Sequence, residues 1–210
     1  MTKSQSTLFI EIEKTIEQLK FEEISAARKA MLQPLIKFIQ SKVNEQKEIK
    51  LNLICTHNSR RSHLAQVWAQ TAAAYFNLKN VFCYSGGTQV TALFYMVIKT
   101  LVRQGFQVNA ISDGCNPNYA INYSQNEPPI IGFSKKYNDA FNPQSEFAAV
   151  LTCSQADTDC PLVIGAEKRI SLSFEDPKAH DHTTQQSQKY HETSLQIATE
   201  MWYVFSQIKQ

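Results

Sequence analysis

The hydrophobic positions of the chain follow two different patterns. Up to about residue 45 they recur at helical spacing, with many Glu, Lys and Gln residues between them and no glycine. Pro34 is expected to kink or break this helical stretch. We therefore expect residues 1–45 to form a helical hairpin appended to a main domain of residues 46–210. The hairpin would pack on that domain or on a second subunit, which makes a homodimer through these helices possible.

Beyond residue 46, short apolar runs alternate with stretches of helical periodicity. The runs predict strands at residues 50–55, 81–87, 147–153 and 169–174, and the periodicity predicts helices near 61–76, 91–103 and 190–208. Strands that alternate with helices indicate an α/β domain of three layers, with a four-stranded parallel sheet and helices on both faces. Prolines interrupt residues 106–146, which we interpret as a long insertion, with a hairpin as one form it could take.

Composition limits the class of protein. The 210 residues are 43% apolar, enough for one sizeable core, and the net charge of +2 is too small to favour a nucleic acid or a membrane surface as partner. No apolar run is long enough for a signal peptide or a membrane span, so we expect a cytoplasmic protein with reduced thiols. The five cysteines are an odd number, so at least one thiol is always unpaired.

The sequence LICTHNSRRS at residues 53–62 contains the clearest chemical pattern. Cys55 ends a predicted strand and Arg61 begins a predicted helix, with five residues between them. A loop of this length can surround a tetrahedral oxyanion with backbone N–H groups, and the helix N-terminus adds partial positive charge. The planar guanidinium of Arg61 can bind two oxygens of the anion. The same positive field stabilises a thiolate at Cys55, which would then face the bound anion as a nucleophile.

This loop resembles that of the low-molecular-weight protein tyrosine phosphatases and of the related thioredoxin-coupled arsenate reductases, and the resemblance covers about residues 48–208. It implies that Cys55 is the nucleophile, that Arg61 binds the anion, that Asn58 shapes the loop and that Ser62 supports the thiolate. It also implies an arsenate or phosphate oxyanion as ligand. The residues expected to surround that oxyanion are Thr56, His57, Asn58, Ser59, Arg60, Arg61 and Ser62.

Three positions depart from the family pattern. His57 stands where the family usually has glycine. A backbone kept at positive φ would strain most residues here, although histidine tolerates it better than β-branched residues, and His57 could tune the thiolate or only cap the loop. Arg60 replaces a frequent cysteine and should make the loop more electropositive. Gln66 replaces a glutamate that helps to bind potassium in the related reductases, which leaves ion dependence open. No metal site and no cofactor are predicted.

An acid is needed downstream of the loop to protonate the departing oxygen. Asp176, followed by Pro177, matches the general acid of both related families. The phosphatases usually have tyrosine directly after this Asp-Pro pair, whereas this chain has Lys178, which does not support a flat phosphotyrosine site. Other acids or bases close by in the sequence are Glu175, His180, Asp181 and His182.

A second pair of cysteines, Cys153 and Cys160, lies at the end of the third predicted strand and just beyond it. Their spacing is too wide for a thioredoxin-type pair and wrong for a zinc knuckle. It resembles the relay cysteines of the thioredoxin-coupled arsenate reductases, which implies thioredoxin as the external reductant. In this interpretation Cys55 attacks arsenate, Cys153 attacks Cys55 to release arsenite, and Cys160 attacks Cys153.

Three functions are therefore weighed. The preferred one is reduction of arsenate to arsenite. The first alternative is a phosphatase that hydrolyses phosphotyrosine or aryl phosphates through a phosphocysteine at Cys55. The second is a non-catalytic anion-binding module, which a long distance between Asp176 and the loop would favour. Cys83 is expected to be buried in its strand and Cys115 to be exposed in a turn, neither with a chemical role.

Overall fold

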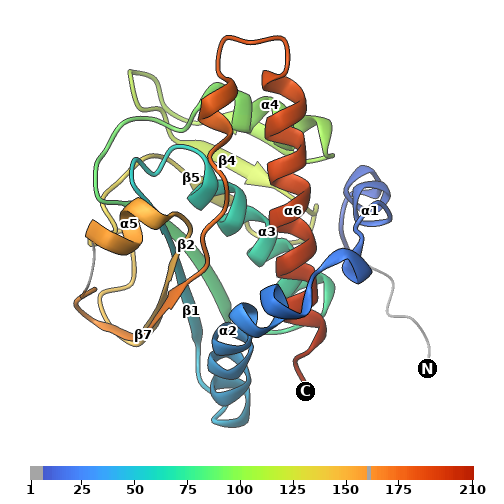
Figure 1. Ribbon diagram of the computed structural model, residues 1–210, viewed down its shortest axis with the longest axis vertical. Coiled ribbons are helices and arrows are strands. Elements are labelled where there is room, and N and C mark those ends of the chain that lie inside the picture. Colours follow the sequence, from blue (N-terminus) through green and yellow to red (C-terminus); the bar gives the residue numbers. More distant parts are fainter. Residues whose placement is uncertain (1–6, 160–161) are drawn as a thin grey trace.

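The computed structural model describes residues 7–159 and 162–210. Its centre is a four-stranded parallel sheet in the order β2-β1-β6-β7 (Figure 1). The strands are β1 (Ile49–Cys55), β2 (Val81–Gly87), β6 (Phe147–Leu151) and β7 (Ala166–Ser171). The predicted parallel sheet is thus confirmed. The third strand ends before Cys153, and the fourth begins three residues earlier than predicted and ends at Ser171.

Alternate residues of the strands point to the two faces of the sheet. Leu51 and Leu53 of β1 enter the larger core, beneath α2 (Ala26–Asn44), α3 (Arg61–Tyr75) and α6 (Gln186–Ser206). Ile54 enters a smaller core on the other face, beneath α5 (Ser154–Asp159). Helices on both faces give the three predicted layers.

The N-terminal segment packs on the larger core. It contains α1 (Ile10–Ile16), a 3-10 turn (Phe21–Glu23) and α2, whose N-terminus is capped by the Ser25 hydroxyl. The helix α2 continues through Pro34, so the expected break does not occur. Its buried face includes Leu32, Leu35 and Ile39. This helix therefore buries its apolar face within the chain itself.

The insertion at residues 106–146 contains a second sheet. Its strands β3 (Gln107–Ala110), β4 (Tyr119–Asn122) and β5 (Ile130–Gly132) are antiparallel, in the order β3-β4-β5. The sheet contacts α4 (Tyr95–Arg103) and α3. It has one strand more than the expected hairpin, because segments this short show too little alternation to be recognised as strands.

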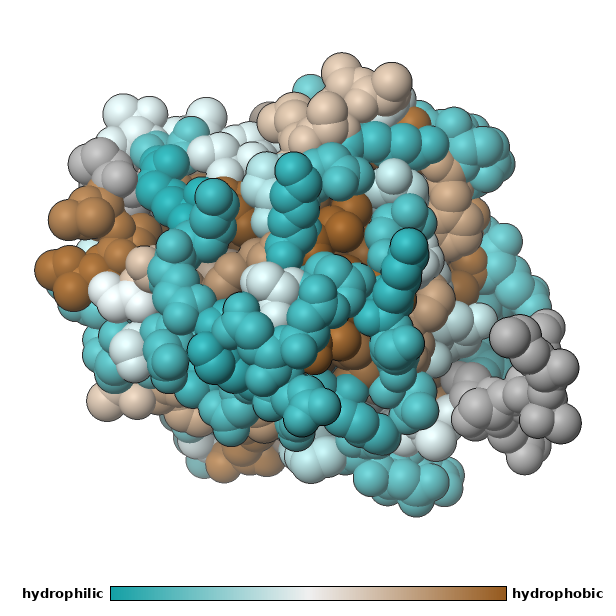
Figure 2. All heavy atoms as spheres, turned by 90° about the horizontal axis from the view of Figure 1, so that it is seen from below, coloured by the Kyte–Doolittle hydropathy of each residue, from teal (hydrophilic) through white to brown (hydrophobic). Residues whose placement is uncertain are grey.

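The surface seen from below is mainly hydrophilic, with scattered apolar patches (Figure 2). In residues 7–159 and 162–210, no helix has the length and apolar character that crossing a membrane requires.

Candidate functional site

The loop between β1 and α3 lies at the carboxyl end of the parallel sheet, where ligands bind in open α/β folds. Its consecutive carbonyls all accept hydrogen bonds from groups outside the loop. The donors are Thr88 N to Cys55 O (3.3 Å), Gln89 N to Thr56 O (2.8 Å), Ser134 Oγ to His57 O (2.9 Å), His63 Nε2 to Asn58 O (2.9 Å) and Phe94 N to Ser59 O (3.0 Å). In the described structure the N–H groups of residues 57–60 have no acceptor, so they remain available to an anion.

Asn58 is the residue that adopts the left-handed conformation, with φ of 44°. His57 itself does not adopt this conformation. Asparagine tolerates this conformation, and here its side chain is bound on both sides. The Asn58 Oδ1 accepts from the backbone N–H of Lys135 at 2.9 Å, and its Nδ2 donates to Ser62 Oγ at 2.9 Å. The turn at Asn58 is thus fixed in part by Lys135, a residue far away in the sequence.

The sulfur of Cys55 lies 3.1 Å from Ser62 Oγ. Because the Ser62 hydroxyl already accepts from Asn58, its own proton is free to point at the sulfur. The arrangement fits the expected roles of Asn58 and Ser62, and Cys55 is only 3% exposed.

Arg61 connects the loop to Asp176. Its Nη1 donates to Phe174 O at 3.1 Å and its Nη2 donates to Asp176 Oδ2 at 2.5 Å. The buried Nε has no partner. A guanidinium has five N–H donors, so Nε–H and the second N–H of Nη2 remain on one edge and can bind two oxygens of an oxyanion.

Asp176 is therefore close to the loop, which disfavours the non-catalytic module. Its Oδ1 accepts from the backbone N–H of Lys178 at 3.0 Å, at the start of a 3-10 turn (Pro177–His180). Of the other acids and bases considered, Asp181 contacts the side chain of Arg60 at 2.7 Å. For Glu175, His180 and His182 the described structure shows no hydrogen bond to the loop.

The guanidinium of Arg60, expected to make the loop more electropositive, is bound by groups outside the loop. Its Nε donates to Tyr190 Oη at 2.6 Å and its Nη2 to Asp181 Oδ2 at 2.7 Å. Arg60 also stacks on the ring of Phe94, 4.1 Å from its centroid. The Nε and Nη2 groups of Arg60 are thus directed to Tyr190 and Asp181, while its backbone N–H has no acceptor in the described structure.

Cys153 lies beside residues 55–62, the expected oxyanion-binding segment, which we call the oxyanion loop. Its sulfur is 3.5 Å from Thr56 Oγ1, and it shares the smaller core with Cys55. Cys160 lies outside the described residues. Cys83 is buried in β2, where burial raises the pKa of its thiol, and Cys115 is exposed.

Two buried side chains behind the loop were not predicted from the sequence. His63, fully buried, donates through Nε2 to Asn58 O, and its Nδ1 lies 3.2 Å from Ser85 Oγ. Burial, with a smaller effect of the Lys135 charge, lowers the pKa of His63 to about 3, so the ring is neutral. Burial likewise lowers the pKa of Lys135 to about 8, and its ammonium lies over the rings of Phe133 and Phe141. The sequence offered no signal, since these contacts join distant segments.

Gly87, at the end of β2, allows the backbone of the loop to approach closely. A Cβ atom at this position would lie 2.7 Å from Asn58 N, Thr56 O and Gln89 O. Only glycine fits such a contact.

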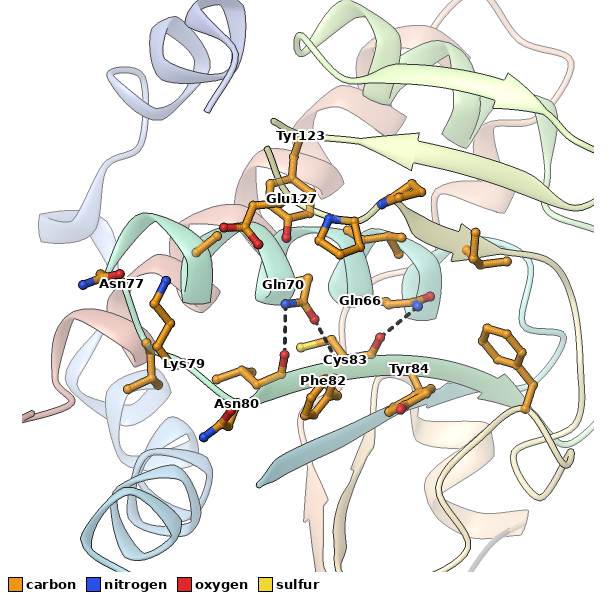
Figure 3. Close-up of a pocket in the computed structure, with 18 residues that line it drawn as sticks. Gln66, Gln70, Asn77, Lys79, Asn80, Phe82, Cys83, Tyr84, Tyr123 and Glu127 are labelled. Atoms are coloured by element: carbon orange, nitrogen blue, oxygen red, sulfur yellow. Dashed lines mark hydrogen bonds between the residues drawn. The ribbon is translucent and has the colours of Figure 1, made fainter. Parts of the chain in front are cut away.

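A separate cavity of about 340 Å³ lies between β2, α3 and the second sheet, and Figure 3 shows the residues that line it. The side chains of Gln66 and Gln70 extend to the backbone of β2, where Gln66 Nε2 donates to Cys83 O at 3.0 Å. Gln66 therefore joins α3 to the edge of the sheet. Neither Cys55 nor Arg61 lines this cavity.

No family model and no curated protein matches the sequence. Solved structures do match the fold. The structure of a YwlE mutant from Bacillus subtilis matches with a TM-score of 0.52 at 14% sequence identity, and the match covers 78% of this chain and 100% of that chain. A low-molecular-weight phosphotyrosine phosphatase from Vibrio cholerae O395 matches with a TM-score of 0.51 at 14% sequence identity, and the match covers 75% of this chain and 94% of that chain. A Drosophila arginine phosphatase matches with a TM-score of 0.50 at 13% sequence identity, and the match covers 76% of this chain and 96% of that chain. The chain has the fold of these phosphatases.

Proposed function

We propose that this chain, which has the fold of low-molecular-weight phosphotyrosine phosphatases, is an arsenate reductase that uses thioredoxin as its external reductant. The observation that favours it is the position of Cys153, whose sulfur lies 3.5 Å from the side chain of the residue that follows Cys55. The register of β1 and β6 pairs Ile54 with Leu151, so the two cysteines leave neighbouring strands at the same end of the sheet.

The first step joins the oxyanion to Cys55. Arsenate is bound by the N–H groups of residues 57–60 and by the free edge of Arg61. The Cys55 thiolate attacks arsenic, and an oxygen leaves as water with a proton from Asp176. Ser62 releases its hydrogen bond to the sulfur as the charge moves to the oxyanion.

The second step is the reduction. The Cys153 thiolate attacks Cys55 Sγ, a Cys55–Cys153 disulfide forms, and the sulfur–arsenic bond breaks with its electron pair moving to arsenic. Arsenic(V) becomes arsenic(III), and arsenite leaves. Cys160 then attacks Cys153, Cys55 leaves as a thiolate, and the Cys153–Cys160 disulfide is reduced by the dithiol of thioredoxin.

A coupled assay tests this proposal. Arsenate, thioredoxin, thioredoxin reductase and NADPH are supplied to the wild type and to Cys153→Ser, Cys160→Ser and the control Cys115→Ser, which changes an exposed cysteine outside the site. We expect NADPH consumption by the wild type and the control. Cys153→Ser should be inactive, and Cys160→Ser should stop after about one turnover as a Cys55–Cys153 species. Sustained turnover by Cys153→Ser would refute the relay.

The second candidate is a phosphatase, and the complete set of Cys55, Arg61 and Asp176 favours it because hydrolysis needs no second cysteine. Under this alternative the Cys153→Ser variant would hydrolyse p-nitrophenyl phosphate at the wild-type rate, and the wild type would not consume NADPH with arsenate. Cys55→Ser would be inactive in both assays.

A further inference from the structure

Two consecutive arginines hold opposite ends of one segment, residues 174–181, which we call the acid segment. Arg61 binds the backbone of Phe174 and the carboxylate of Asp176 at its beginning. Arg60 binds Asp181 at its end, with 2.7 Å between Nη2 and Oδ2. The acid segment is therefore fastened to the oxyanion loop at both ends.

At the end of the acid segment that Arg60 holds, the side chains form a closed network of hydrogen bonds. Arg60 Nε donates to Tyr190 Oη at 2.6 Å, and the Tyr190 hydroxyl donates to Asp181 Oδ1 at 2.7 Å. Gln186 Nε2 donates to the same oxygen at 2.9 Å. The side chains of Arg60 and Asp181 are only 12% and 11% exposed, so solvent screens their attraction little.

The charge of Asp181 is stabilised in this position. Burial alone raises the pKa of Asp181, but the hydrogen bonds from Gln186 and Tyr190 and the charge of Arg60 outweigh it and hold the pKa below its ordinary value. Arg60 is also fixed from its other side, because it stacks on Phe94, whose N–H donates to Ser59 O in the loop.

We propose that Arg60, together with Asp181 and Tyr190, is a positioning residue that holds Asp176 over the oxyanion loop and does not bind the oxyanion through its side chain. This role rests on the proposed function, in which Asp176 donates the proton. Arg61 has two tasks, since it binds both the acid segment and the oxyanion. When an anion competes for Arg61, the contact between Arg60 and Asp181 keeps the acid segment in place.

The two possible roles of Arg60 predict different kinetics. A residue that binds the oxyanion affects every substrate and weakens binding of inorganic phosphate. A residue that positions the acid affects only substrates whose leaving group needs a proton. Phenyl phosphate has such a leaving group, whereas p-nitrophenol leaves readily as its anion.

The test compares Arg60→Gln, Asp181→Asn and Tyr190→Phe on these two substrates. Lys42→Gln is the control, because it also removes a buried, ion-paired cation, with Glu167 at 2.6 Å, near the beginning of β7. We expect kcat for phenyl phosphate to fall about tenfold or more in Arg60→Gln and Asp181→Asn, with KM and the inhibition constant of phosphate changed by less than about twofold. Tyr190→Phe should have a smaller effect in the same direction.

Equal losses on both substrates, or weaker inhibition by phosphate, would overturn the proposal. Amide hydrogen exchange provides a second measurement, which does not depend on enzymatic activity. With inorganic phosphate bound, the amides of residues 174–181 should exchange faster in Asp181→Asn than in the wild type or Lys42→Gln, and unchanged exchange would contradict the positioning role. A wild type inactive towards arsenate and both aryl phosphates would refute the proposed function, and the exchange result would still decide the role of Arg60.

Discussion

Acid should weaken the folded state through His63. This ring is fully buried, and its neutral form donates from Nε2 to Asn58 O while Nδ1 faces Ser85 Oγ. Protonation would add a second donor at Nδ1 and place a charge close to the ammonium of Lys135. Burial and that neighbouring charge therefore lower the pKa of His63 from 6.5 to about 3.

The pKa of His63 differs between the folded and the unfolded chain, and this difference sets the sign of the effect of pH on stability. Because the pKa is lower in the folded state than in the unfolded chain, acidification protonates the unfolded chain first. The contribution of His63 is therefore complete above about pH 6.5 and is lost as the pH falls towards 3. At about pH 5 the loss amounts to about 2 kcal/mol, and near pH 3 it amounts to about 4 kcal/mol.

Urea unfolding measures this loss, with the fluorescence of the buried Trp68 and Trp202 as the signal. His63→Gln is the matched variant, since its side-chain amide can still donate to Asn58 O but does not titrate. Between about pH 7.5 and about pH 5 the free energy of unfolding of the wild type should fall by about 2 kcal/mol more than that of the variant, because all other histidines are common to both. Equal losses, or an NMR titration of His63 near its ordinary pKa, would refute the reasoning.

Three further predictions concern the same region. Burial lowers the pKa of Lys135 from 10.5 to about 8; wild-type stability to urea should therefore rise between these pH values by up to about 3 kcal/mol, and Lys135→Met should abolish that rise. Gly87→Ala adds a Cβ 2.7 Å from the loop backbone and should reduce phosphate affinity about tenfold or more in calorimetry, so unchanged affinity would contradict the packing. Cys55→Ser should lose all turnover yet bind phosphate within about threefold of the wild type; residual turnover would exclude Cys55 as the nucleophile.

The sequence predicts those parts of the molecule that depend on local pattern. The strands of the parallel sheet and the helix that begins at Arg61 follow from apolar periodicity, and they place Cys55 at the carboxyl end of β1. The spacing from Cys55 to Arg61 is enough to predict a loop for an anion, because a strand and a helix on either side fix where it begins and ends.

Contacts between distant segments could not be predicted. The left-handed residue is Asn58 and not His57, because the carbonyls of the loop are bound by groups from residues 88–94 and from Ser134. In the sequence, Arg60 has no visible partner. In the structure its side chain binds Asp181 and Tyr190, which lie more than a hundred positions away in the chain. A pattern of neighbouring residues contains no information on such partners.

The insertion and the N-terminal helix both support the site, although neither provides a reacting group. Residues 133–137, in the second half of the insertion, bind the loop through Ser134 Oγ and the N–H of Lys135. They also pair with Gly87, whose N–H donates to Lys135 O and whose carbonyl accepts from Tyr137 N. From α2, Arg28 stacks on the ring of Phe174, whose carbonyl accepts from Arg61. Because close-packed contacts transmit small displacements, a change in either segment should alter the geometry of the loop before it alters the stability of the sheet. The segments outside the sheet therefore help to fix the geometry of the loop.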